Sequence, residues 1–369
     1  MPPKSSDIHH DGFRPTENPV PEVLYSALAC GDRVIDVRSP GEFAEDHIPG
    51  ARNVPLLDDE ERKVTGTLYR VEGADSATQW ALQRLNLRLQ AFLSELLSHI
   101  TTDSVPIICC ARGGDRSAHV VQFLIQSGLA AKQLIGGYRS YRKDVCQQLE
   151  QCDLKQLWIL DGYTGVGKTD VLRQIALQQP DRIIDLEGHA GHRSSILGDL
   201  GLKPTSQKRF ESLLAAALTK LDRQARWILI EGESRKVGNR QIPAALWQRM
   251  AKAPRIELFA SMELRVRWLV DEYDTGDDWR QLHQRVDRLR SYRQLGDERV
   301  DHLQKCLELG DPESAARSLL EHHYDPRYQH GPQKNFQIRL ENLDACRAAV
   351  ALVEQLEQVT TDRPDEAGA

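Results

Sequence analysis

Short apolar runs alternate with longer amphipathic stretches through the first part of the chain. Residues 33–39 (RVIDVRS) and 105–111 (VPIICCA) are rich in β-branched side chains, which is typical of buried strands. Residues 77–99 and 117–128 instead space their apolar positions as one face of a helix does, and the second stretch stops at a glycine. Strands that alternate with helices predict a parallel sheet covered on both faces, so we expect residues 1–150 to form an α/β domain.

Strand patterns start again at LWILDG, which is followed by a helical stretch from about Lys168. The buried-strand pattern returns at 182–188, 226–234 and 255–262. We therefore expect residues 151–271 to form a second α/β domain.

Residues 272–359 show no strand pattern and are rich in Arg, Glu and Leu, which predicts a C-terminal helical region. Its last helix, at about 343–358, is amphipathic. The polar tail 360–369 is expected to be disordered. The predicted fold class is α/β, with two parallel-sheet domains followed by helices.

Composition adds limits to this picture. The 369 residues are 40% hydrophobic and 28% charged, which is ordinary for a globular chain. A net charge of −6 repels a polyanion at long range, so a nucleic-acid partner needs a local cationic patch. Seven scattered cysteines do not form a disulfide pattern and favour a reducing cytoplasm. No apolar run approaches the ~18 residues of a membrane span, and the first residues lack a signal-peptide core, so we expect no membrane association.

Residues 162–169, GYTGVGKT, match the phosphate-loop pattern G-x-x-x-x-G-K-[ST] between a predicted strand and a predicted helix. The glycines let backbone N–H groups curl around phosphate oxygens, and the helix N-terminus adds positive charge. A lysine then contacts the outer phosphates, and a hydroxyl can hold Mg²⁺. The residues expected to bind phosphate are Gly162, Gly165, Gly167, Lys168 and Thr169. Any pyrophosphate suits this loop, so ATP is not required.

Three further residues are candidates near this loop. Glu231 ends the strand at 226–234, where an acidic residue would hold magnesium or a water molecule, although a simple strand-end carboxylate is the alternative. His192 and Arg193 follow the second strand of this domain, where they would reach a diphosphate or an RNA backbone; a solvated loop is their alternative. The sequence assigns no other metal and no organic cofactor.

A second loop, CCARGGDRS at 109–117, places a thiol before a glycine-rich turn. Cys110 starts the pattern C-x-x-x-x-x-R, whereas Cys109 falls at the end of the strand and is expected to be a small buried apolar residue. Five residues between the cysteine and Arg116 fit a tetrahedral phosphate better than a single sulfur atom. This spacing also occurs in cysteine phosphatases, which remain an alternative, although no histidine precedes Cys110 and the second domain would be unexplained.

Other residues are expected to support the thiol loop. Arg112 and Arg116 would make it an anion cradle, unless one of them simply pairs with a carboxylate such as Asp115. Gly66 is expected to be a position of close backbone approach beside the loop, with a plain turn glycine as the alternative. Asp36 and Arg38 are expected to organise the loop rather than to react.

The stretch 36–55, DVRSPGEFAEDHIPGARNVP, together with the thiol loop resembles the rhodanese family. Rhodanese domains carry sulfur on a cysteine at the start of a loop whose N–H groups point inward. The loop and the helix N-terminus after it lower the pKa of such a thiol.

Taken together, the two loops resemble the tRNA 2-selenouridine synthase family, in which a rhodanese domain is fused to a phosphate-loop domain. The resemblance spans roughly residues 30–330. It is carried by CARGGDRS, GTLY (66–69), GGYRSYR (136–142), DLEGHAGHRSSILG (185–198), QKRFE (207–211), IEGESRKVG (230–238) and HYDPRY (323–328). The stretch 188–195 departs slightly from the family pattern but keeps His192 and Arg193.

The resemblance implies an enzyme that transfers selenium-containing groups. Its substrate would be tRNA with 2-thiouridine at the wobble position. A geranyl group from geranyl diphosphate would be attached to the sulfur, selenophosphate would then supply selenium, and 2-selenouridine would result. We expect geranyl diphosphate at the phosphate loop and selenophosphate at the thiol loop.

An RNA partner requires cationic and aromatic groups for backbone contacts and base stacking. The candidates are Tyr138, Arg139, Arg142, Arg235, Lys236, Arg285 and Arg288. Arg285 and Arg288 are three residues apart, so a helix would present both on one face. For any single patch, a solvated charged helix is the alternative.

Two other function classes remain open. One is an ATP-driven kinase or ATPase with a rhodanese regulator, whose nucleotide hydrolysis would be indifferent to tRNA. The other is a phosphatase or phosphate-binding module, in which Cys110 would turn over aryl phosphates.

Overall fold

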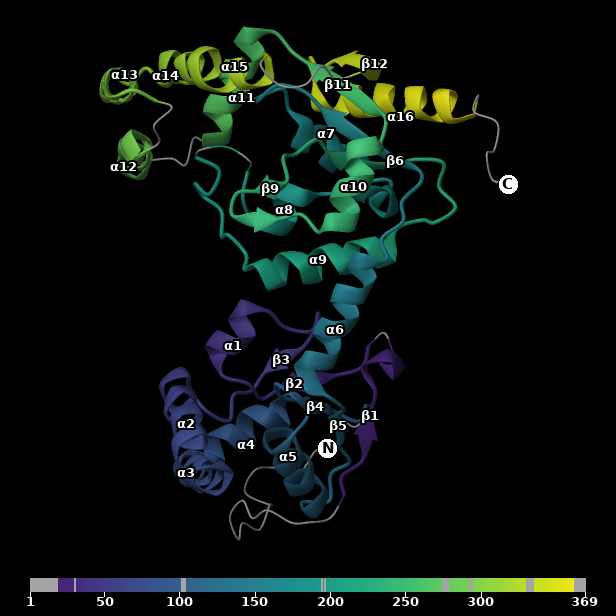
Figure 1. Ribbon diagram of the computed structural model, residues 1–369, viewed down its shortest axis with the longest axis vertical. Coiled ribbons are helices and arrows are strands. Elements are labelled where there is room, and N and C mark those ends of the chain that lie inside the picture. The colour runs from purple at the N-terminus through teal and green to yellow at the C-terminus, as the bar shows by residue number, and fades with distance from the viewer. Residues whose placement is uncertain are drawn as a thin grey trace. The chain divides into compact units, whose positions relative to one another are not determined.

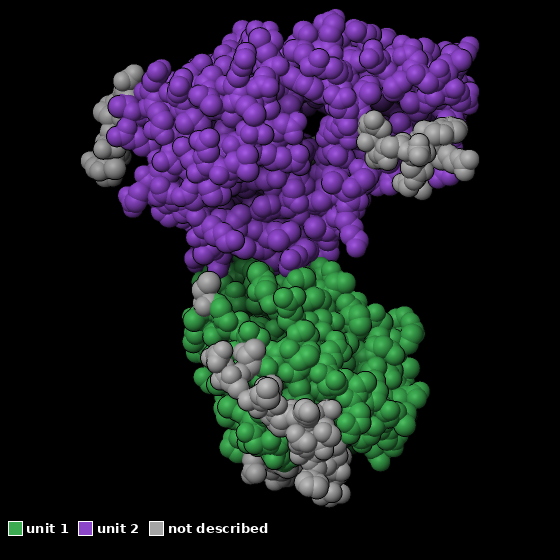
Figure 2. All heavy atoms as spheres, turned by 180° about the vertical axis from the view of Figure 1, so that it is seen from behind, with its two compact units in different colours: residues 1–147 green, residues 148–369 purple. Residues whose placement is uncertain are grey.

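The computed structural model describes residues 19–29, 31–100, 104–193, 195, 197–273, 279–291, 295–329 and 335–361. The chain divides into two compact units, residues 1–147 and 148–369 (Figure 2). Each unit contains a five-stranded parallel sheet with helices, which confirms the α/β fold class. Within the described part of the chain, no helix is both long and apolar enough to cross a membrane.

The sheet of unit 1 has the strand order β1-β5-β4-β2-β3 (Figure 1). Its strands are β1 (Glu22–Val23), β2 (Val34–Asp36), β3 (Arg52–Asn53), β4 (Ile107–Cys109) and β5 (Lys132–Leu134). The two predicted strands, β2 and β4, are neighbours, and every residue in them is buried. The other strands, β1, β3 and β5, each contain an exposed residue, so their sequences lack a buried apolar run.

The helices of unit 1 begin where the sequence supplies capping residues. Ser39 with Glu42, and Asp58 with Glu61, form reciprocal capping boxes that satisfy backbone N–H groups of the first turn. The predicted helix at 77–99 is two helices that meet at Arg88. The helices are η2 (Tyr25–Ala27), α1 (Pro40–Glu45), α2 (Asp59–Val71), α3 (Ala74–Leu87), α4 (Leu89–Ser98), α5 (Asp115–Gln126) and α6 (Gly137–Glu150).

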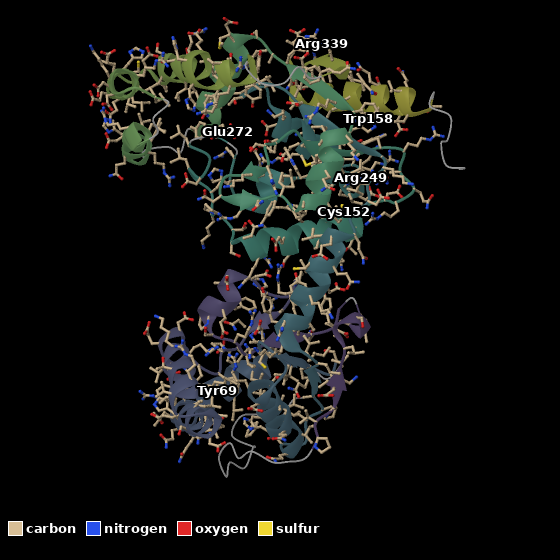
Figure 3. All side chains as sticks on the ribbon, viewed as in Figure 1. Tyr69, Cys152, Trp158, Arg249, Glu272 and Arg339 are labelled. Carbon is tan, nitrogen blue, oxygen red and sulfur yellow. The ribbon has the colours of Figure 1, made fainter. Side chains whose placement is uncertain are left out.

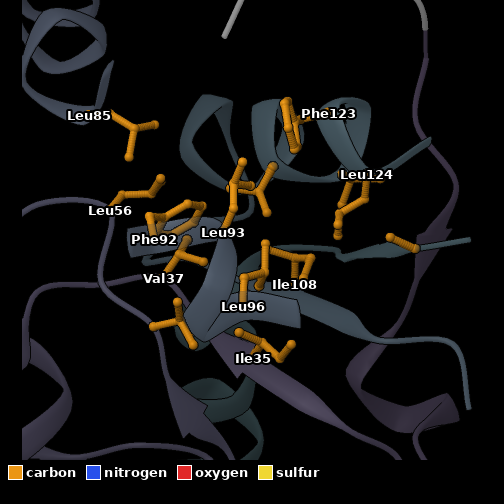
Figure 4. Close-up of a cluster of buried hydrophobic side chains, with 14 of the residues drawn as sticks. Ile35, Val37, Leu56, Leu85, Phe92, Leu93, Leu96, Ile108, Phe123 and Leu124 are labelled. Carbon is orange, nitrogen blue, oxygen red and sulfur yellow. The ribbon is translucent and has the colours of Figure 1, made fainter. Parts of the chain in front are cut away.

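The core of unit 1 fixes the end of β4. Side chains of β2, α4 and α5 interlock there, among them Ile35, Leu93 and Leu124 (Figure 4). Cys110, the first residue after β4, belongs to the same buried cluster. The backbone that carries this thiol is therefore held by close packing against α4 and α5.

The sheet of unit 2 has the strand order β12-β11-β6-β8-β7 (Figure 1). Its strands are β6 (Leu157–Asp161), β7 (Ile183–Ile184), β8 (Ile228–Glu231), β11 (Arg255–Phe259) and β12 (Phe336–Glu341), and β9 (Lys236–Val237) with β10 (Arg240–Gln241) forms a separate antiparallel pair. The four strands predicted from buried-strand patterns are β6, β7, β8 and β11. Trp158 on β6 (labelled in Figure 3) is only 1% exposed and belongs to the same buried cluster as Val166 of the phosphate loop.

Helices pack against this sheet. Helix α16, the predicted amphipathic last helix, contacts α7, which starts at the phosphate loop. Trp227, the residue before β8, donates a hydrogen bond of 2.9 Å from its Nε1 to Glu357 of α16. This bond links α16 to the start of β8. These helices are α7 (Lys168–Ala176), η3 (Pro180–Arg182), α8 (Leu186–Ala190), α9 (Gln207–Lys220), α10 (Ala244–Lys252) and α16 (Ala345–Thr361).

The expectation that residues 272–359 contain no strand is wrong. Strand β12 pairs in parallel with β11 at the edge of the sheet, with Ile338 opposite Ile256. Only Ile338 of its six residues is fully buried, because an edge strand exposes most of its side chains. The buried-strand pattern is therefore missing from its sequence.

Apart from β12, the described part of the C-terminal region is mostly helical, as predicted, and has a hydrophobic core that includes Leu269, Leu303 and Leu320. Its helices are α11 (Met262–Tyr273), α12 (Trp279–Arg288), η4 (Leu289–Ser291), α13 (Asp297–Glu308), α14 (Pro312–Leu319), the π-helical turn η5 (Leu320–Tyr324) and α15 (Asp325–Gln329). Of the tail predicted to be disordered, Thr360 and Thr361 end α16, and residues 362–369 lie outside the described residues.

Candidate active site

Cys110 lies at the start of a five-residue loop that leads into α5, where Gly114 is the N-cap. Its Sγ is 3.1 Å from the Oγ of Ser117 and 3.9 Å from the carbonyl oxygen of Gly114. Gln133 donates a hydrogen bond to that same Ser117 hydroxyl at 2.9 Å. The thiol thus faces the N-terminus of a helix, whose positive end stabilises a thiolate or a bound anion.

The GGYRSYR motif supports the thiol loop through its backbone. The N–H of Tyr138 donates to the carbonyl of Cys110 at 2.8 Å, and the N–H of Arg139 donates to Ala111 at 3.0 Å. Gly137 has φ of +55°, and a Cβ there would lie 2.2 Å from the Cys110 oxygen. Only glycine fits this contact, so the motif's glycine pair is explained by the shape of the loop.

Cys109 is not a candidate nucleophile. It is completely buried at the end of β4. Burial, and then the charge of Asp36, raise the pKa of the Cys109 thiol well above its ordinary value. The expectation that Cys109 is a small buried residue is confirmed. The reactivity of Cys110 stays a prediction.

The two arginines of the thiol loop differ in their partners. Arg112 is exposed and makes no ion pair or side-chain hydrogen bond within the described part of the chain. Arg116 pairs with Glu42 of α1 at 3.1 Å, so the carboxylate alternative holds for Arg116, with Glu42 in place of Asp115. Burial opposes the charge of Glu42, but Arg116 holds the pKa of that carboxyl below its ordinary value. Contact of either arginine with substrate stays a prediction.

Gly66 lies inside α2, so the alternative of a turn glycine is wrong. A Cβ at Gly66 would lie 3.0 Å from Nη1 of Arg62, whose Nε is 3.4 Å from Glu42, the partner of Arg116. Gly66 therefore leaves room for Arg62 beside that ion pair. Tyr69, in the same GTLY motif, is 62% exposed (Figure 3). A direct approach of Gly66 to the thiol loop stays a prediction.

Asp36 and Arg38 form a buried ion pair with a shortest distance of 2.7 Å, in keeping with the expected loop-organising role. The Arg38 guanidinium also lies 3.8 Å from the ring centre of Tyr138. The Tyr138 hydroxyl donates to the buried carboxylate of Asp46 at 2.8 Å, and Arg142 is 3.7 Å from the same carboxylate.

These contacts hold Tyr138 and Arg142 within unit 1, and their contact with RNA stays a prediction. The ring and hydroxyl of Tyr138 are both engaged inside unit 1, and the Arg142 side chain is only 14% exposed. The sequence could not reveal this, because the carboxylate that holds both residues, Asp46, lies about 90 positions earlier in the chain. Arg139 is exposed and remains a candidate for RNA contact.

In unit 2, β6 ends at Asp161 and the phosphate loop follows directly. Gly162, Gly165 and Gly167 have φ values of +147°, +78° and +77°, as the loop's turns require. The ammonium of Lys168 donates to the carbonyls of Gly162 and Tyr163 at 3.0 and 3.2 Å. This geometry keeps the lysine over the loop, beside the N-terminus of α7.

The lysine is held in its charged form. Burial opposes the charge of Lys168, but Tyr328, Glu233 and Glu187 hold the pKa of the ammonium above its ordinary value. A permanent cation at the loop suits a ligand with several negative charges.

The carboxylates of Glu187 and Glu231 lie near the Thr169 hydroxyl, at the end of the phosphate loop. Thr169 donates to Glu187 of α8 at 2.9 Å, and the N–H of Glu187 donates to Glu231 at 3.0 Å. The other oxygen of Glu231 is buried and has no hydrogen-bond partner among the described residues. Burial, and then the charges of Glu187 and Asp185, raise the pKa of Glu231 well above its ordinary value.

Sequence reasoning missed Glu187, although its place after β7 in the DLEG stretch is a recognisable signal. No cluster of three His, Cys, Asp or Glu side chains that could hold a metal occurs in the described ranges. Thr169 and Glu187 do fit Mg²⁺, because that ion is commonly bound by one or two protein oxygens together with phosphate oxygens.

The HYDPRY motif braces the phosphate loop. Arg265 of α11 donates to the Thr164 carbonyl at 2.9 Å and forms two hydrogen bonds, of 2.6 and 3.0 Å, with Asp325. The hydroxyl of Tyr328 is 3.5 Å from that of Thr164, and its ring lies 5.1 Å from the ring of Tyr163. These residues lie far apart in the sequence, so no spacing pattern could link them.

His192 lies next to the carboxylate pair. The backbone N–H of His192 donates to the backbone carbonyl of Glu187 at 3.1 Å. Its ring is enclosed by two glycines, because a Cβ on Gly198 or on Gly238 would come within 2.6 Å of ring atoms. The ring Nδ1 is buried and has no partner among the residues that the structure describes. Phosphate contact by His192 stays a prediction.

Arg193 is engaged elsewhere. It pairs with Glu272 near the end of α11 at 2.5 Å and donates to the carbonyl of Leu200 at 2.8 Å (Figure 3). The assignment of Arg193 as a phosphate ligand is thus not supported by its contacts, which close the loop after α8 onto α11.

The remaining RNA candidates are also distinguished by their contacts. Arg235 and Lys236, at β9, are exposed, and their side chains make no ion pair among the described residues. Arg285 of α12 pairs with Asp199, and its contact with RNA stays a prediction. The side chain of Arg288 lies outside the described residues, so its expected shared face with Arg285 stays a prediction.

Comparison with known proteins agrees with both units. A family model for the tRNA 2-selenouridine synthase AAA domain matches residues 155–356, and a rhodanese-like domain model matches residues 20–144. The tRNA 2-selenouridine synthase of Salmonella arizonae is 34% identical over 347 residues, which are 85% of this chain and 93% of that protein. The tRNA 2-selenouridine synthase of Cupriavidus necator is 36% identical over 249 residues, 67% of this chain and 66% of that protein.

The rhodanese-like model covers the thiol loop, and the AAA-domain model covers the phosphate loop and most of the helical region. The resemblance carried by the motifs is confirmed, and this chain belongs to the tRNA 2-selenouridine synthase family.

Proposed function

We propose that this protein converts 2-thiouridine at the wobble position of tRNA to 2-selenouridine in two steps. In the first step, the sulfur of 2-thiouridine attacks the first carbon of geranyl diphosphate, the carbon–oxygen bond breaks, and diphosphate leaves. In the second step, the selenium of selenophosphate attacks the base carbon and geranylthiol leaves. Water then cleaves the phosphorus–selenium bond and releases phosphate.

The observation that carries this proposal is the occurrence of two anion sites of different chemistry in one chain. One is a phosphate loop with a charged lysine, and the other is a thiol at a helix N-terminus. A diphosphate suits the first and a selenophosphate the second. Alkylation of the sulfur turns a poor leaving group into a better one. The phosphate loop would therefore serve the alkylation, and the thiol loop would serve the selenium insertion that follows.

At the phosphate loop, Lys168 neutralises the charge that develops on the leaving diphosphate, and the N–H groups at the start of α7 bind its oxygens. Thr169 and Glu187 would hold Mg²⁺, which when bound supplies further neutralisation of the diphosphate. No nucleotide is needed for this step.

At the thiol loop, the N-terminus of α5 and the exposed Arg112 bind the oxygens of selenophosphate. Cys110 lies at the start of that cradle, where it serves selenium insertion. The tRNA phosphates contact exposed cations such as Arg139, Arg235 and Lys236. A reducing cytoplasm, which holds tRNA and keeps thiols reduced, fits this chemistry.

The proposal is tested by mass analysis of wobble-position nucleosides. The purified protein is incubated with 2-thiouridine tRNA, first with geranyl diphosphate alone and then with selenophosphate. We expect geranylated 2-thiouridine in the first reaction and 2-selenouridine in the second. Failure to alkylate the sulfur, together with nucleotide hydrolysis that is indifferent to tRNA, would instead identify an ATPase with a rhodanese regulator.

A further inference from the structure

The helical part of unit 2 contains an apolar cavity of about 510 Å³. It lies among α11, α12, α13, α14 and the π-helical turn η5, which Figure 1 shows gathered on one side of the unit's sheet. Most of the side chains around it are aliphatic. They include Leu197, Leu269, Val286, Leu303, Ala316 and Leu319. A cavity of this size lies in the usual range for small-molecule sites.

The polar groups at this cavity already have partners. The hydroxyl of Tyr273 is 2.5 Å from that of Ser195. Glu308, the one carboxylate among the described lining residues, lies 3.4 Å from the Nε2 of His283. The walls therefore offer a hydrocarbon surface and no obvious site for a charged group, so the cavity suits an apolar chain.

Two structural elements join this cavity to the phosphate loop. Helix α11 holds the loop carbonyl of Thr164 through Arg265, and one turn later, about 6 Å along the axis, its Leu269 lines the cavity. The turn η5 places Tyr324 on the cavity, and the next residue, Asp325, holds Arg265. A π-helical turn at this junction is unusual and is often found at functional sites.

We propose that this cavity receives the hydrocarbon chain of the diphosphate that binds at the phosphate loop, and that its depth sets the accepted chain length. The inference rests on the proposed function, since it supplies a site for the geranyl tail. A phosphate loop alone does not distinguish a nucleotide from an isoprenoid diphosphate. An apolar cavity lined by Leu269, one helical turn from the arginine that holds the loop, favours the isoprenoid. A nucleotide would leave its sugar and base polar groups without partners there.

The test fills the cavity and measures ligands that share a head group. Ala316→Phe places a ring in the cavity, and Glu313→Phe, at an exposed position of the same helix, is the matched control. Binding of geranyl diphosphate, dimethylallyl diphosphate and inorganic diphosphate is measured by calorimetry. We expect Ala316→Phe to lower the affinity for geranyl diphosphate by about tenfold or more, while the affinity for inorganic diphosphate changes little. The affinity for dimethylallyl diphosphate, whose hydrocarbon chain is half as long, should fall less than the affinity for geranyl diphosphate.

A second variant guards against simple misfolding. Leu303→Ala enlarges the cavity and should raise the affinity for farnesyl diphosphate relative to geranyl diphosphate. If both variants leave the chain-length preference of the wild type unchanged while geranyl diphosphate still binds, the tail lies elsewhere and the inference is overturned, but the proposed function stands. If the wild type binds inorganic diphosphate and geranyl diphosphate equally well, the cavity contributes nothing. If it binds neither, the proposed function fails as well.

Discussion

Cys109 and Cys110 are neighbours in the chain, but their thiols lie in different surroundings. Cys109 ends β4 in the sheet interior, and its thiol pKa is raised by burial. Cys110 begins the loop, with its Sγ near the N-terminus of α5. The motif C-x-x-x-x-x-R was enough to select Cys110 from the sequence. The partner of Arg116 was not predictable, because Glu42 lies 74 positions away and shows no pattern of its own.

We predict that Cys110→Ala blocks selenium insertion and leaves geranylation intact, so that geranylated 2-thiouridine accumulates. The reason is that the thiol loop and the phosphate loop belong to separate units. Nucleoside mass analysis of the reacted tRNA provides the measurement, with Cys109→Ala as the matched control that should retain both steps. Normal 2-selenouridine formation by Cys110→Ala, or loss of it in Cys109→Ala alone, would show that the assignment is wrong.

The complementary substitution is Lys168→Ala. This change removes the cation that lies on the phosphate loop and that would neutralise the leaving diphosphate. Loss of such an electrostatic contact commonly costs about 10²–10³ in rate. Single-turnover transfer of a labelled geranyl group to thiolated tRNA measures this, while conversion of pre-geranylated tRNA by the same variant should persist. An unchanged transfer rate would contradict a role for the phosphate loop in geranylation.

At the scale of elements, the sequence predicted the strands whose residues are largely buried, the edge strand β7 among them, and missed strands with exposed positions such as β5 and β12. Every residue of β2, β4, β6 and β8 is buried and β11 alternates buried with less buried residues, whereas only Ile338 of β12 is fully buried. The glycine motifs were recognisable in the sequence, but the contacts that require glycine at these positions were not. Gly137 is required because its backbone meets the thiol loop, a contact that joins two distant segments.

This contact gives a prediction about loop shape. Gly137→Ala places a Cβ 2.2 Å from the carbonyl oxygen of Cys110 and must distort the thiol loop. Adopting a positive φ alone costs an alanine about 1–2 kcal/mol. We expect selenium insertion to be lost and geranylation to be retained. Gly128→Ala is the control, because Gly128 has φ of +80° but open space around a Cβ. Equal effects of the two changes on selenium insertion would mean that strain, and not the loop contact, is responsible.

At the scale of the whole molecule, an acidic chain has to bind a polyanion. The net charge is −6, so binding depends on cations that are not already paired within the protein. The sequence identified cationic clusters but could not separate paired from unpaired members. Arg142 and Arg285 are paired with Asp46 and Asp199, whereas Arg235 and Lys236 are exposed at β9 and make no ion pair among the described residues.

We therefore predict that replacing both Arg235 and Lys236 by Ala weakens tRNA binding and flattens its salt dependence. Each contact with a single-stranded phosphate contributes about −0.7 to the slope of log K against log salt, so the double variant should flatten the slope by about 1–1.5 units. Arg285→Ala is the control and should change the slope little, because its guanidinium already neutralises Asp199. Filter binding over a salt series measures the slopes, and geranyl diphosphate affinity should stay constant in both variants. A wild-type slope in the double variant would place the tRNA on other cations, of which Arg139 at the thiol loop is the first to test.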